Sequence, residues 1–113
     1  MRALPLLAVA ALAGAGCGSS ETSEVFETNS VKMVRGNEFD PRAISVKAGS
    51  TVTWTNEDGV PHNAVAKDGD GPKSELFGKG KTYSWKAATP GTIEYVCTIH
   101  PGMDGTIEVG PGG

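Results

Sequence analysis

The sequence contains the stretch Tyr95-Val96-Cys97-Thr98-Ile99-His100-Pro101-Gly102-Met103 near its C-terminus. Within this stretch a thiol, an imidazole and a thioether recur at intervals of three residues. The only other histidine of the chain lies far upstream, in Pro61-His62-Asn63, ahead of a predicted strand at residues 64–66. Since the chain has only two histidines and both belong to this set, the pattern indicates a metal site rather than scattered polar side chains.

The chemistry of these side chains favours one metal. Two histidines and one cysteine in a trigonal arrangement, with a weak axial methionine, are typical of a blue-copper electron-transfer centre. Taken singly, the residues have ordinary explanations, because a lone cysteine is usually a small buried hydrophobe and a methionine fills gaps in a core. Taken together, they predict one copper ion, Cu(I) or Cu(II), with four ligands: His62, Cys97, His100 and Met103.

The pattern Cys97-x-x-His100-x-x-Met103, with His62-Asn63 upstream, resembles the cupredoxins. Its short ligand loop is most similar to amicyanin and some halocyanin-like proteins, whereas plastocyanin usually has more residues between the second histidine and the methionine. The domain as a whole is similar to amicyanin-like, plastocyanin-like and halocyanin-like domains, and residues 39–56 supply a second matching segment. The resemblance covers residues 31–109. It implies a small Greek-key β-sandwich of seven to eight strands and a one-electron carrier with redox proteins as donor and acceptor. It also implies a hydrogen bond between Asn63 and Thr98, which would support the ligands without binding the metal.

Periodicity also predicts an all-β domain. Residues 51–55 alternate, with Val52 and Trp54 on one face and threonines on the other. Turn residues such as Pro90-Gly91 separate this segment from similar ones. Predicted strands cover residues 31–34, 43–47, 51–55, 64–66, 81–86, 92–97 and 106–109, a number that suits a sandwich of two sheets.

The N-terminal segment predicts export. Residues 1–16 have the positive start and short apolar run of a signal peptide, and the run is too short to span a bilayer. Gly14-Ala15-Gly16-Cys17 resembles a bacterial lipobox, in which Cys17 is acylated. The alternative is cleavage after Ala15, which leaves Cys17 as a free thiol. We expect the periplasm or the outer face of the cytoplasmic membrane as the location.

The predicted organisation follows from these segments. The signal peptide precedes a lipid-anchor cysteine with a flexible tether at 17–30, a cupredoxin domain at 31–109 and a tail at 110–113. Three of the thirteen acidic residues lie in the tether, so the domain itself is close to neutral although the whole chain carries a formal charge of −3. Nothing in this balance suggests a nucleic-acid partner, and we expect a monomer.

Other functions fit the residues less well. A structural zinc site favours four cysteine or histidine ligands, for which a thioether is a poor substitute. A copper oxidase or nitrite reductase needs further histidines, so we expect no enzymatic activity. Periplasmic copper binding and trafficking remains as an alternative to electron transfer. We also expect an apolar collar around His100, made of Val60, Pro61, Ile99, Pro101 and Met103.

Overall fold

The structure, a computed structural model, describes residues 24–112. This part of the chain contains nine strands and no helix that is long and apolar enough to cross a membrane. The strands are β1 (Val25–Glu27), β2 (Ser30–Val34), β3 (Glu38–Asp40), β4 (Ala43–Lys47), β5 (Ser50–Asn56), β6 (Val65–Ala66), β7 (Thr82–Ala87), β8 (Gly91–Val96) and β9 (Asp104–Gly110).

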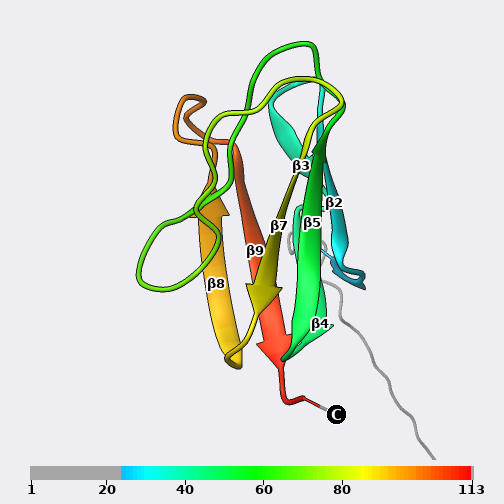
Figure 1. Cartoon of the computed structure of the whole chain (residues 1–113), viewed down its shortest axis with the longest axis vertical. Coiled ribbons are helices and arrows are strands. Elements are labelled where there is room, and N and C mark those ends of the chain that lie inside the picture. Colours follow the sequence, from blue (N-terminus) through cyan, green and yellow to red (C-terminus); the bar gives the residue numbers. More distant parts are fainter. Residues whose placement is uncertain (1–23, 113) are drawn as a thin grey trace, which may run out of the picture.

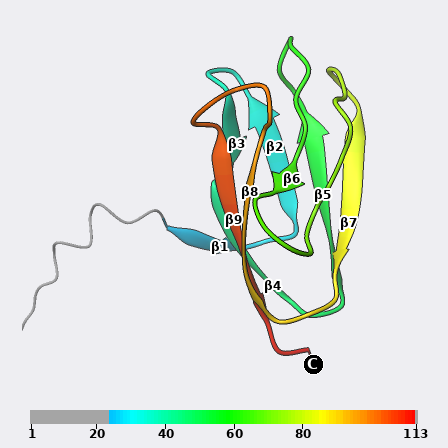
Figure 2. The same cartoon turned by 90° about the vertical axis from the view of Figure 1, so that its left-hand side faces the viewer.

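The strands form two sheets that pack face to face (Figures 1 and 2). One sheet has the order β1-β4-β9-β8-β6 and the other the order β3-β2-β5-β7. Both mix parallel pairs, such as β4 with β9, and antiparallel pairs, such as β8 with β9. The predicted all-β sandwich is therefore confirmed. The expected number of strands was too low, because β1 and β3 were not predicted.

Aromatic side chains from both sheets fill the core between them. Alternation along β5 buries Val52 and Trp54, as the sequence predicted. The Tyr95 ring on β8 lies edge-on to Trp54 at 5.3 Å and to Phe39 at 4.6 Å between ring centroids. Because Tyr95 is fully buried and precedes Cys97 by two residues, this cluster gives the ligand stretch a rigid base.

The N-terminal segment departs from its prediction. Residues 25–27, expected to belong to a flexible tether at 17–30, instead form β1, which pairs in parallel with β4 from Val25 opposite Ala43. All three residues of β1 are exposed, so no alternation of apolar residues marked the strand in the sequence. The predicted signal peptide and Cys17 lie outside the described residues.

Two connecting segments define the functional end of the sandwich. Residues 57–61, after β5, and residues 97–103, between β8 and β9, lie at the same end, away from the C-terminus (Figure 1). The sheets therefore bring two parts of the chain together that are far apart in sequence.

Candidate metal centre

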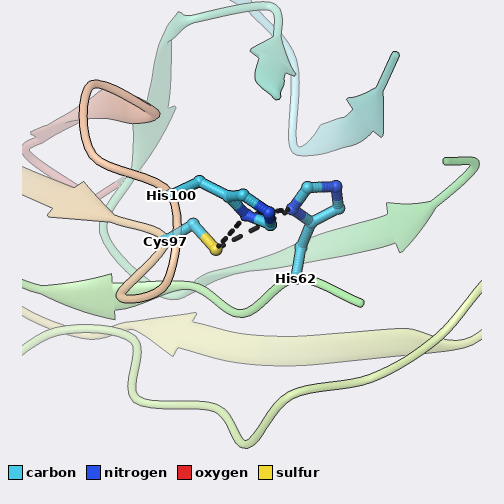
Figure 3. Close-up of side chains that lie close together, drawn as sticks. All are labelled: His62, Cys97 and His100. Atoms are coloured by element: carbon cyan, nitrogen blue, oxygen red, sulfur yellow. Dashed lines mark hydrogen bonds between the residues drawn. The ribbon is translucent and has the colours of Figure 1, made fainter. Parts of the chain in front are cut away.

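Three predicted ligands meet at this end of the molecule (Figure 3). His62 Nδ1 lies 3.1 Å from His100 Nδ1, and Cys97 Sγ lies 3.3 Å from His100 Nδ1 and 3.8 Å from His62 Nδ1. His62 and Cys97 are buried, whereas His100 is half-buried and is the member nearest to solvent. One thiol and two imidazole nitrogens thus face a common point.

The spacing of these atoms fits a bound metal ion. A circle through the three atoms has a radius of about 2.0 Å, which matches a metal–imidazole bond of about 2.0 Å and is slightly shorter than a metal–thiolate bond of about 2.3 Å. His62, Cys97 and His100 could therefore hold one ion between them. The donor set of two nitrogens and one sulfur is that of a trigonal blue-copper site.

The segment 97–103 is closed by its own backbone. Cys97 N donates to Met103 O at 3.0 Å, and Met103 N donates to His100 O at 3.0 Å. Between them, Pro101 and Gly102 occupy the centre of a tight turn, where Gly102 has a φ of 89°. A turn with proline followed by a residue at positive φ favours glycine in the second place. This sequence therefore directs His100 back towards Cys97.

Met103 lies at the end of this loop and is only 1% exposed. Its burial agrees with a sulfur inside the protein, and its role as axial ligand stays a prediction. The same burial shows that Met103 was wrongly expected in the apolar collar. The large exposed apolar side chains at this end are those of Val60, Leu76 and Ile99, at 43, 48 and 48%. Leu76 was not foreseen; it precedes Phe77, whose backbone pairs with that of His62.

Asn63 joins the two segments that carry the predicted ligands. Its Nδ2 donates to Thr98 Oγ1 at 3.0 Å, and its Oδ1 accepts a hydrogen bond from Thr98 N at 2.9 Å. The expected contact between Asn63 and Thr98 is therefore present. Because Asn63 is buried and follows His62 directly, the two bonds fix the distance between His62 and the loop of Cys97.

One contact of the site was missed by the sequence reasoning. Asp58 Oδ2 lies 2.9 Å from His62 Nε2, on the side of the ring away from Cys97. The hydrogen bond with His62, together with one from Gly59 N, holds the pKa of the Asp58 carboxyl below its ordinary value, although burial acts in the opposite direction. The residues Glu57-Asp58-Gly59 were interpreted only as a turn. Their one available signal was a carboxylate four residues before a candidate ligand.

Several known proteins are similar to this chain in sequence and in structure. Amicyanin-alpha of Methylorubrum extorquens is 36% identical to this chain, over 96% of the chain and 99% of the relative. A plastocyanin of Scenedesmus fuscus is 40% identical, over 63% of the chain and 85% of the relative. The crystal structure of amicyanin from Paracoccus versutus superposes with a TM-score of 0.65 at 31% identity, over 71% of this chain and 78% of that one. Residues 23–110 match the family of copper-binding proteins described as plastocyanin/azurin, and the chain therefore belongs to this family.

Proposed function

We propose that the chain is a one-electron carrier between redox proteins in the bacterial envelope, and that His62, Cys97, His100 and Met103 bind its single copper ion. The observation that carries this proposal is the arrangement of the two imidazole nitrogens and the thiol around one point, 3.1 to 3.8 Å apart. When bound there, copper supplies the Cu(II)/Cu(I) couple. Family membership and the amicyanin and plastocyanin relatives support the same function.

The surrounding residues suit electron transfer because they limit movement. The backbone bonds of the 97–103 loop hold Cys97 and His100, and the Asn63–Thr98 pair holds His62 against that loop. A site fixed in this way has little freedom to rearrange when its charge changes, which keeps the barrier to electron transfer low. The half-buried edge of His100 is the proposed point of electron entry and exit.

We propose that partners dock on the apolar surface around His100, which we define by Val60, Leu76 and Ile99. Encounters between redox proteins bury small areas and are weak, so a few apolar side chains suffice. Within residues 24–112 one group of potential metal ligands of this kind is found, and the whole sequence has only two histidines. Both observations support a carrier rather than a copper enzyme.

Electron exchange between two copies of the chain tests this function without a known partner. We expect NMR lines of a Cu(I)/Cu(II) mixture to broaden through rapid self-exchange, with copper retained in the presence of an excess of a Cu(I)-binding acceptor protein. An Ile99→Glu variant should slow self-exchange by more than about tenfold, because two like charges then meet at the docking surface.

The matched control is Phe26→Glu, which adds the same charge at an equally exposed apolar residue, on β1 at the edge of the sheet. It should leave the exchange rate nearly unchanged. Ready loss of copper to the acceptor, with negligible self-exchange, would favour the trafficking alternative over electron transfer.

We propose further that the protein is exported and anchored through a lipid on Cys17. The lipobox-like sequence Gly14-Ala15-Gly16-Cys17 supports this proposal. The mature protein should partition with membranes, and a Cys17→Ser variant should be released or left unprocessed. Mass spectrometry of the mature N-terminus decides the question, because an unmodified N-terminus at Gly16 would contradict lipidation.

A further inference from the structure

A carboxylate lies against the buried face of one proposed copper ligand. Asp58 Oδ2 is 2.9 Å from His62 Nε2, while Nδ1 of the same ring faces Cys97 and His100 (Figure 3). The His62 side chain is fully buried, and that of Asp58 is only 11% exposed. The ring of His62 is therefore held between the metal site on one side and a nearly buried carboxylate on the other.

The carboxylate is itself held in place by the segment that leads to His62. Asp58 Oδ1 accepts a hydrogen bond from Gly59 N at 2.7 Å, and Asp58 N donates to Asn56 Oδ1 at 2.7 Å. The fully buried Asn56 also donates to Val60 O at 2.9 Å and to Phe77 O at 2.8 Å. These bonds connect Asp58 to the end of β5 and to the segment that pairs with His62, so its carboxylate has a fixed orientation.

Two consequences follow for His62. An ionised carboxylate only accepts hydrogen bonds, so the proton of the neutral ring lies on Nε2 and the lone pair of Nδ1 points towards the metal site. A carboxylate in this place also makes the imidazole a stronger ligand. Its negative charge, 2.9 Å from the His62 ring, favours the more positively charged Cu(II) form over Cu(I).

We propose that Asp58 is a positioning residue that fixes the tautomer of His62 and favours the oxidised copper centre. The inference rests on the proposed function, and it adds a determinant of the reduction potential outside the four ligands. Glu57, the residue before Asp58, forms an exposed ion pair with Lys32. Glu57 Oε2 lies 3.6 Å from Lys32 Nζ, and both side chains are about half exposed. Glu57 therefore offers a negative charge one residue from Asp58 that does not contact His62.

Two substitutions separate the charge of Asp58 from its hydrogen bond. Asp58→Asn keeps an oxygen that can accept from His62 Nε2 but removes the charge. At a fixed applied potential we expect the Cu(I)/Cu(II) ratio to rise about tenfold, which corresponds to about 59 mV, with the blue colour retained. Asp58→Ala removes the hydrogen bond as well, and should in addition weaken copper binding by about 10- to 100-fold and change the EPR hyperfine splitting.

The matched control is Glu57→Gln, which removes one exposed charge without touching His62. Because exposed charges are screened by water and salt, the ratio should change by less than about twofold. A second measurement needs no copper. The ¹⁵N NMR shifts of His62 in the metal-free protein should show a proton on Nε2 in the wild type and Asp58→Asn, and a mixture of tautomers in Asp58→Ala.

The possible outcomes separate this inference from the function on which it rests. Equal potentials for Asp58→Asn and Glu57→Gln, or an unchanged tautomer in Asp58→Ala, would overturn the role of Asp58 while the wild type still carried electrons. A wild-type protein that formed no blue centre would overturn both proposals.

Discussion

Replacing Cys97 by serine is expected to abolish the blue colour of the copper-loaded protein. The thiolate is the donor of the charge-transfer transition, and a serine hydroxyl is neither anionic near neutral pH nor a soft ligand. Since loss of a residue that merely supports a ligand costs about 10- to 100-fold in metal affinity, loss of Cys97 itself should cost more than about a hundredfold. Visible absorption and competition with a copper chelator measure the two effects.

A control variant shows that the effect belongs to the thiolate. Met103→Leu conserves the volume of a residue that is 1% exposed, and it removes only the proposed weak axial ligand. This variant should keep the colour, with a changed reduction potential. Circular dichroism of each metal-free variant verifies the fold. Blue colour in the Cys97→Ser protein would contradict the proposed site.

The second large effect concerns stability, at a glycine that packs against the core. Gly105 on β9 lies opposite Tyr95 on β8, and a Cβ at Gly105 would stand 2.6 Å from both Cζ and the hydroxyl oxygen of Tyr95. The Tyr95 ring is fully buried against Phe39 and Trp54, so it has no free space to move into. We expect Gly105→Ala to lower the free energy of unfolding by about 3 kcal/mol, the upper part of the range for overpacked cores.

The same strand supplies the control for this prediction. At Gly110 the nearest atom to an added Cβ is Val46 O at 3.8 Å, an ordinary contact. Gly110→Ala should therefore change the free energy of unfolding by less than about 0.5 kcal/mol. Urea unfolding of the metal-free proteins compares the two variants without a contribution from copper binding. Equal unfolding midpoints would show that the ring of Tyr95 yields at little cost.

The sequence predicted those parts of the fold whose burial pattern is local. The alternation of Val52 and Trp54 in β5 marks a strand with one buried face, and the structure contains it. The short strands β1 and β3 gave no such signal, because β1 is wholly exposed and only Phe39 of β3 is buried. Their pairing depends on neighbouring strands from elsewhere in the chain.

The same distinction applies to the metal centre. Cys97 and His100 share one short loop, so their proximity followed from spacing, and the chemistry of the set pointed to His62. The contact between Asp58 and His62 could not be predicted in this way, because it depends on how Asn56 shapes the segment 57–61. The burial of Met103 likewise follows from the turn at Gly102 and from its place directly before β9.

Titration of the wild-type protein with Cu(II), followed by visible absorption and EPR, tests the central claim most directly. His62, Cys97, His100 and Met103 should bind one copper ion per chain, with intense visible absorption from thiolate-to-copper charge transfer and a compressed hyperfine splitting. A stoichiometric Cu(II) complex that remains colourless, with the wide hyperfine splitting of ordinary copper complexes, would contradict it.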